Sequence, residues 1–107
     1  MVFFNQSALD DIEQIFVGLL EWHTKDNFQL FMTFDEVWSY RNDLFNVGNS
    51  LDILPYNAEA QYEMHKKYGR YVYRYDRNKR TQWYFVYDKI GNDVFINKII
   101  SNYLTVS

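Results

Sequence analysis

The chain has 107 residues, which is the size of one compact domain. Hydrophobic residues make up 48% and aromatic residues 21%, so a sizeable core is expected and a disordered chain is excluded. Cysteine is absent, which excludes disulfides, cysteine-type zinc sites and thiol catalysis. The formal net charge of −3, taken alone, argues against a nucleic-acid partner.

The start of the chain predicts a short strand that leads into a helix. Val2-Phe3-Phe4 is apolar, and Ser7 with Asp10 three residues later suits a helix N-cap and its acidic partner. Apolar residues then recur every three or four positions, which predicts a helix from about Ala8 to Trp22 with one buried face. Its acidic residues are expected to face water: Asp10, Asp11, Glu13 and Glu21.

A second amphipathic helix is predicted up to Phe45, after a polar break at residues 23–27. It begins either at Asn27 or at Thr33, where Thr33-Phe34-Asp35-Glu36 resembles a capping box. Gly48 suits the position just after its end. The two helices therefore form a helical hairpin.

The second half predicts three antiparallel strands after a loop at residues 49–64, which holds the only proline and one helical turn near residues 58–62. Residues 70–75 and 81–87 alternate as half-buried strands do, and residues 94–100 follow a turn at 91–93. The order is β-α-α-β-β-β, an α+β fold with the hairpin packed on a mainly antiparallel four-stranded sheet. The first strand is expected at or next to an edge, beside a later strand.

Charge divides sharply along the chain. Residues 1–63 carry two basic and eleven acidic side chains, a net charge of −9, whereas residues 64–107 carry nine basic and three acidic, +6. The basic half can therefore bind anions despite the sign of the total, unless the two halves simply complement each other. No basic leader or long apolar stretch is seen, so we expect a cytoplasmic protein without a membrane partner.

With this element order, the whole chain, as a single domain over residues 1–107, resembles the RelE/ParE superfamily of toxins from bacterial type II toxin–antitoxin systems. The segments that carry the resemblance are Val2-Phe3-Phe4 with residues 7–12, and residues 69–75, 83–88, 92–96 and 99–103. The resemblance implies a cognate antitoxin as partner and either of two targets. RelE-like members cut mRNA on the ribosome without a metal or other cofactor, and ParE-like members inhibit DNA gyrase.

For a nuclease, the resemblance implies Arg74, Arg80 and Tyr103 as catalytic residues and a set of RNA-binding cations: Lys66, Lys67, Arg70, Arg77 and Lys79. Each has a structural alternative. Arg74 can pair with Asp76 or Asp88, Tyr103 can be a core aromatic, and the turn cations can be merely solvated. Enzyme status stays open, because Asn102 stands where several relatives carry a histidine and an amide is no general acid.

Other features favour structural roles. The aromatic stripe is expected on the core face of the sheet, with base stacking as its alternative: Tyr71, Tyr73, Trp83 and Phe85. His65 has no acidic or histidine partner nearby in sequence and is expected at the surface. Two further functions stay open: a non-catalytic protein-binding module with the same fold, and a general RNA-binding domain.

Overall fold

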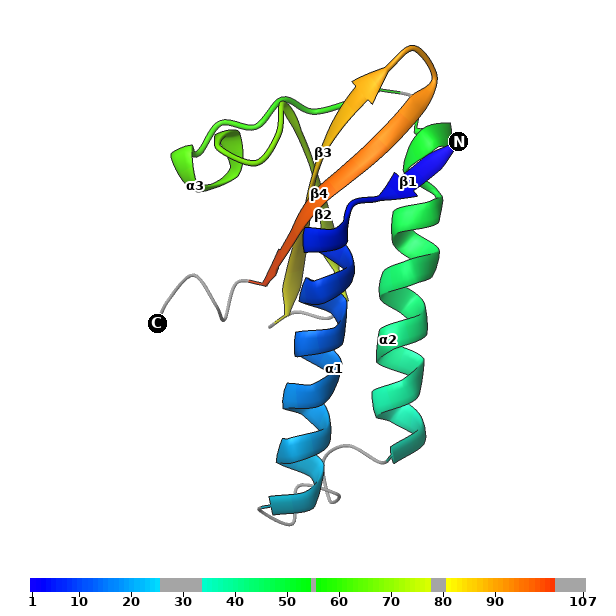
Figure 1. The fold of residues 1–107 in the computed structure, drawn as a ribbon, viewed down its shortest axis with the longest axis vertical. Coiled ribbons are helices and arrows are strands. Elements are labelled where there is room, and N and C mark those ends of the chain that lie inside the picture. The colour runs from blue at the N-terminus through cyan, green and yellow to red at the C-terminus, as the bar shows by residue number, and fades with distance from the viewer. Residues whose placement is uncertain (26–33, 55, 78–80, 102–107) are drawn as a thin grey trace.

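The computed structural model describes residues 1–25, 34–54, 56–77 and 81–101 (Figure 1), with the side chains of 21–25 and 34 left aside. In chain order the elements are β1 (Val2–Phe4), α1 (Gln6–Lys25), α2 (Phe34–Asn49), the short 3-10 helix η2 (Leu51–Ile53), α3 (Glu63–Lys66), β2 (Tyr71–Asp76), β3 (Gln82–Ile90) and β4 (Asp93–Ser101). The predicted α+β class is confirmed, and so is the order of the strands and of the two long helices.

The four strands form one mixed sheet in the order β1-β4-β3-β2. β1 lies at an edge beside a later strand, as the sequence predicts; it runs parallel to β4, while β2, β3 and β4 are antiparallel neighbours. Gly91 takes a φ of 61° in the β3–β4 turn, a left-handed conformation that glycine adopts without strain. β3 extends to Ile90, beyond the predicted end at Tyr87, because its pairing with β4 continues to Asp93.

One face of the sheet packs against the two long helices. Strand alternation brings Trp83, Phe85 and Tyr87 of β3 into one buried cluster with residues of both helices: Ala8, Ile12, Tyr40 and Leu44. The indole Nε1 of Trp83 donates a hydrogen bond of 2.7 Å to the Tyr40 hydroxyl. Tyr71 and Tyr73 of β2 pack against this cluster, so the expectation that the aromatic stripe forms the core face is confirmed.

The helix ends differ from the sequence-based expectations. α1 begins at Gln6, and the amides of Ala8 and Leu9 donate to the carbonyl of Asn5, so Ser7 lies inside the helix and the predicted N-cap is wrong. α2 is described from Phe34, which agrees with the later of the two predicted starts. It continues to Asn49, so Gly48 is not a helix stop.

Close packing explains the glycine at position 48. A Cβ atom there would lie 2.6 Å from the ring of Phe4 and 3.1 Å from Ile96. Such distances leave no room for a side chain. Gly48 therefore lets α2 approach β1 and β4 closely. The glycine at this position is explained by this close packing and not by the end of the helix.

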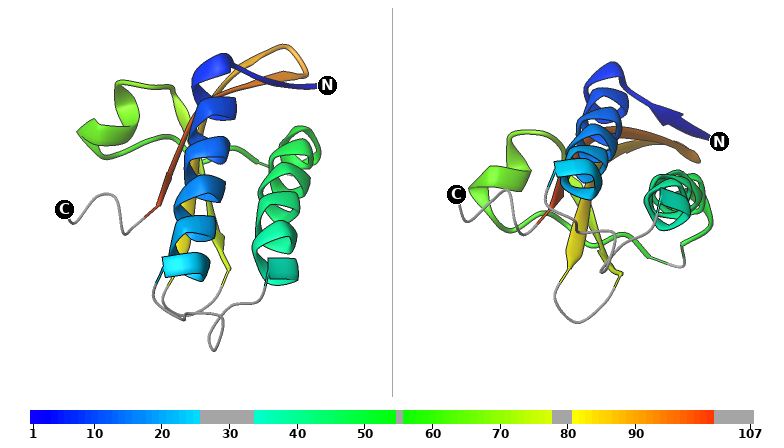
Figure 2. Two further views of the ribbon diagram at one scale, coloured as in Figure 1. Left: turned by 60° about the horizontal axis from the view of Figure 1, so that its bottom comes forward. Right: turned by 90° about the horizontal axis from the view of Figure 1, so that it is seen from below.

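The connection between α2 and β2 also departs from the prediction. Its helical turn is α3, at residues 63–66, and not at residues 58–62. Residues 58–60 instead run beside the start of β2, where the Val72 amide donates to the Ala58 carbonyl and the Ala60 amide to the Arg70 carbonyl. The ribbon views place α2 and α3 on opposite sides of the sheet (Figure 2). The connection therefore crosses the edge of the sheet at β2.

Asp11 was predicted to face water and is instead 8% exposed. Its carboxylate accepts hydrogen bonds from Lys98 Nζ at 2.8 Å and from the backbone amide of Ile99 at 2.9 Å. β1 pairs with β4 only as far as Ile96, so the Ile99 amide has no strand partner on that side. The Asp11 carboxylate accepts the hydrogen bond of this amide in place of a strand carbonyl, and this contact joins α1 to β4.

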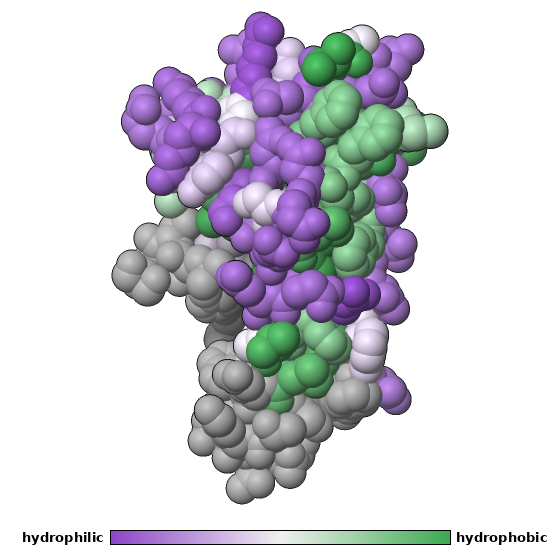
Figure 3. Space-filling view, viewed as in Figure 1, coloured by the Kyte–Doolittle hydropathy of each residue, from purple (hydrophilic) through white to green (hydrophobic). Residues whose placement is uncertain are grey.

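The space-filling view shows polar side chains over much of the visible surface and an apolar area at its upper right (Figure 3). On β1 and β4, Phe3 stacks on Phe95 with ring centroids 5.1 Å apart, and Phe3 keeps 41% of its surface exposed. Among the helices described, none is long and apolar enough to cross a membrane.

Candidate functional site

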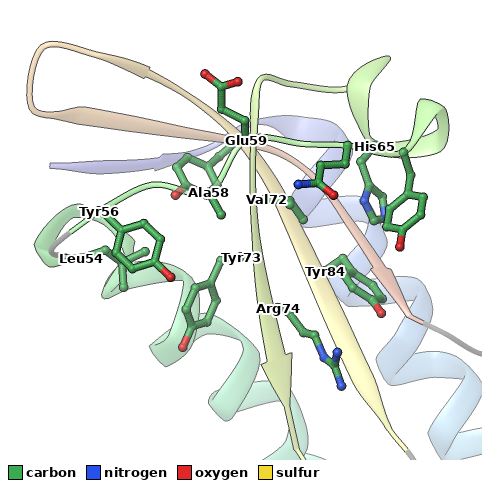
Figure 4. Close-up of a pocket in the computed structure, with 12 residues that line it drawn as sticks. Leu54, Tyr56, Ala58, Glu59, His65, Val72, Tyr73, Arg74 and Tyr84 are labelled. Carbon is green, nitrogen blue, oxygen red and sulfur yellow. The ribbon is translucent and has the colours of Figure 1, made fainter.

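A hollow of about 420 Å³ lies between Leu54 with residues 56–65 and strands β2 and β3 (Figure 4). We call it the β2 groove. Five tyrosines form most of its aromatic lining: Tyr56, Tyr62, Tyr73, Tyr84 and Tyr87. Its ionisable side chains other than tyrosine are Glu59, His65 and Arg74. This volume falls in the range of small-ligand sites in proteins.

Arg74 reaches the groove because β2 alternates. Tyr73 and Tyr75 on either side of it pack against the core, so Arg74 points away from the helices and stands opposite Tyr84 of β3. Its Nε donates to Asp76 at 2.7 Å, and this bond raises the pKa of Arg74. The predicted alternative of an ion pair with Asp76 is therefore confirmed. Asp88 instead accepts from the Arg70 amide and from Asn97.

His65 is the largest departure from the sequence-based site. It was expected at the surface and is 3% exposed. Its ring lies 4.9 Å from the ring of Tyr84 and stands edge-on to Tyr62 at 5.8 Å. Neither ring nitrogen has a hydrogen-bond partner in the part of the chain that the structure describes.

Burial also sets the charge of His65. Removing the imidazole from water disfavours its protonated form and lowers the pKa below the usual 6.5. A neutral imidazole has one N–H donor and one nitrogen lone pair. Both are unmet here, although buried polar groups nearly always find partners.

Acidic residues of the same chain hold most of the other predicted RNA-binding cations. Arg70 pairs with Glu59 at 3.1 Å, Lys66 with Glu63 at 3.8 Å, and Arg77 with Asp43. Arg77 also lies over the Tyr40 ring at 3.9 Å, on the helix side of the sheet. These cations are spread over several elements, and none of them lines the groove.

The remaining predicted cation within the described ranges is Lys67, whose Nζ lies 5.2 Å from the centroid of the Tyr68 ring. Lys79, Arg80 and Tyr103 lie outside the described residues. Of the predicted site residues that are described, Arg74 alone borders the β2 groove. Tyr73, which the sequence analysis assigned to the core stripe with base stacking as the alternative, also lines it, and the other groove residues were not predicted as site residues.

Glycine at position 69 is the one signal that points to the position of His65. A Cβ on Gly69 would lie 2.9 Å from the Tyr87 carbonyl oxygen and 3.1 Å from Val86. The chain after α3 therefore lies directly on β3, which brings His65 onto the Tyr84 ring. A glycine directly before a predicted strand indicates a close backbone approach, but it does not say to which strand.

No cluster of three or more histidine, aspartate or glutamate side chains that could hold a metal ion occurs within the described ranges. Comparisons with protein-family models, with curated proteins and with solved structures found no match for this chain. A functional assignment therefore depends on the fold and on the groove.

Proposed function

We propose that this chain is the toxin component of a type II toxin–antitoxin system, with a fold of the RelE/ParE type. The observation that carries the proposal is the arrangement of the elements. A helical hairpin covers one face of a four-stranded sheet in which β1 joins the edge beside β4, and Arg74 is left exposed on the other side. The resemblance places a phosphate-binding arginine of nuclease members on this strand.

The charge distribution supports an anionic target on the sheet side. Residues 64–107 carry a net charge of +6, although the chain as a whole is at −3. Such local fields steer anionic partners even when total charge is negative. The proposed target is mRNA at the ribosome, with DNA gyrase as the alternative within the same class, and the proposed partner is a cognate antitoxin.

Growth arrest tests this proposal. Expression of the wild-type chain in bacterial cells is expected to arrest growth, and co-expression of a small antitoxin encoded beside it is expected to restore growth. In the nuclease form, Arg74→Ala and Tyr103→Phe relieve the arrest while the protein stays folded. Lys89→Ala removes the same charge from the far end of β3 and should leave the arrest intact. A wild-type chain that never arrests growth contradicts the proposal.

A second candidate is a non-catalytic protein-binding module of the same fold. The stacked and partly exposed pair Phe3 and Phe95 favours it, since β1 is an edge strand that can receive an extended partner segment. Pairing of Arg70, Arg74 and Arg77 with acids of the same chain also favours it. In that case, Phe3→Ser abolishes capture of the partner and expression of the wild type leaves growth unaffected.

A further inference from the structure

His65 places a polar imidazole ring in a buried position. Both nitrogens lie in an aromatic environment without a partner in the described ranges, which is a costly arrangement in a folded protein. His65 also forms part of the wall of the β2 groove. Its nitrogens are therefore placed where a ligand can supply the missing hydrogen bonds.

Three groove residues lie in a row. The ring of His65 lies on the ring of Tyr84, and Tyr84 stands directly opposite Arg74 in the β2–β3 pairing. Opposed residues on neighbouring strands have Cβ atoms about 5 Å apart. In Figure 4, β2 runs between these three side chains and a second group formed by Leu54, Tyr56 and Tyr73, because Tyr73 and Arg74 are neighbours on β2 and point to opposite faces of the sheet. The part of the groove on the face away from the helices thus brings together an imidazole, a guanidinium and the ring of Tyr84.

This combination selects for a particular ligand chemistry. Tyrosine faces bind flat rings by stacking, a guanidinium binds an anionic oxygen, and a neutral imidazole donates and accepts one hydrogen bond each. The ion pair of Arg74 with Asp76 is more than half exposed on both sides, so it is weak enough for a phosphate to compete with it. A nucleotide carries all three complementary groups in one molecule.

We propose that the β2 groove binds a single nucleotide of an RNA strand, with its phosphate at Arg74, its base against the rings of Tyr62 and Tyr84, and a polar edge of the nucleotide at His65. This inference rests on the RNA-directed form of the proposed function and deepens it by naming the site. The central claim of the proposal is that His65, which the sequence predicted at the surface, is a ligand-binding residue.

Tyr62 lies beside His65 at the solvent-exposed side of the groove. Both imidazole nitrogens are shielded from solvent, and Tyr62 stands edge-on to the ring while keeping 67% of its own surface exposed. Exposed side chains change rotamer within nanoseconds. In the proposed complex, rotation of the exposed Tyr62 side chain admits the nucleotide to His65.

The first experiment observes His65 directly. The chain has two histidines, so His23→Gln leaves His65 as its single imidazole. Its ¹⁵N signals are followed by NMR while adenosine 3′-monophosphate is added, with adenosine alone and inorganic phosphate alone as partial ligands. The nucleotide is expected to shift the His65 nitrogens, and inorganic phosphate is expected to leave them in place. A shift with a carboxylate-terminated peptide and none with the nucleotide overturns the proposal.

Matched variants test the separate contacts. Arg74→Ala is expected to weaken nucleotide binding about 10-fold or more, because a charge-assisted hydrogen bond is lost, whereas Lys89→Ala changes the affinity less than about 2-fold. His65→Phe keeps the stacking on Tyr84 and removes both nitrogens. It should fold normally and bind about 10-fold more weakly. Unchanged affinity of a folded His65→Phe protein overturns the role of His65.

Growth measurements separate this inference from the proposed function. If the wild type arrests growth but its His65 signals do not respond to the nucleotide, the nucleotide site is wrong and the toxin assignment stands. If the nucleotide binds but expression leaves growth unaffected, the toxin assignment is wrong and the site stands. If His65→Phe loses both nucleotide binding and growth arrest while remaining folded, both proposals are supported.

Discussion

Asp11 and His65 are both buried, and they show how differently the two sides of the molecule are built. Asp11, where α1 meets β4, is held by the Lys98 ammonium and by the Ile99 amide. His65, on the β2 groove, lies between two tyrosines and has no hydrogen bond within the described ranges. A satisfied buried group supports the fold, whereas an unsatisfied one costs stability.

The aromatic residues follow the same division. On the helix side, Trp83 is 5% exposed and its indole is hydrogen-bonded to Tyr40. On the groove side, Tyr56 and Tyr62 are 75% and 67% exposed. The helix side is thus a packed core, and the groove side presents aromatic surface to solvent. Substitutions on the two sides are therefore expected to differ in both the size and the sign of their effects on stability.

Asp11→Ala has the largest expected effect. It leaves the Lys98 ammonium and the Ile99 amide without their partner, and the free energy of unfolding should fall by about 3 kcal/mol. Urea denaturation measures this loss. The matched control is Asp10→Ala, which removes the neighbouring exposed carboxylate and should change stability by less than about 0.5 kcal/mol. Equal effects of the two substitutions would show that Asp11 does not join α1 to β4.

Tyr40→Phe has the second-largest expected effect on stability. It removes the hydroxyl that accepts the Trp83 indole N–H in the core and leaves this donor unpaired, at an expected cost of about 1–2 kcal/mol. Urea denaturation followed by tryptophan fluorescence measures the loss. In the double variant Trp83→Phe with Tyr40→Phe, the two losses should not add, since the same hydrogen bond is removed twice. Additive losses contradict the bond.

His65→Phe is expected to stabilise the folded protein, in contrast to the two substitutions above. Replacing the unpaired nitrogens with carbon while keeping a ring on Tyr84 should raise the free energy of unfolding by about 1 kcal/mol. The measurement is the midpoint of urea denaturation near neutral pH. A loss of stability instead would mean that the imidazole is hydrogen-bonded in solution and that the comparison with Asp11 fails.

The same residue predicts a dependence on pH. Because burial lowers the pKa of His65 below 6.5, the unfolded chain takes up a proton more readily than the folded chain. The stability contributed by the neutral imidazole is therefore complete above pH 6.5 and is lost as the pH falls below this value. Wild type should lose more stability than His65→Phe between about pH 7 and pH 5. Parallel profiles for the two proteins contradict the prediction.

Arg70→Ala is expected to have the smallest effect. Its ion pair with Glu59 is about two-thirds exposed on both sides, and solvent screens such pairs so that they contribute little to stability. Urea denaturation should show at most a marginal loss of stability, and this loss should shrink further in high salt. A larger loss would mean that the contact of residues 58–60 with β2 depends on this pair.

Much of the fold is predictable from the sequence because its signals are local. Alternation in residues 71–75 and 83–87 defines both strands and their core face, and the three-to-four spacing after Ala8 defines α1. Arg74 as an exposed cation paired with Asp76 is equally local, since the two lie two residues apart on one strand. The ends of the elements were less well predicted, because they depend on contacts with other segments.

The sequence by itself determined the α+β class, the order of the elements and the separation of an acidic half from a basic half. Only the tertiary structure decided that Asp11 joins a helix to a strand 88 residues away, that Gly48 accommodates Phe4, and that His65 lies without a partner beside a groove. Each of these depends on how a segment far away in the chain is placed against the residue. Periodicity reports which face of an element is buried, but not which atoms cover it.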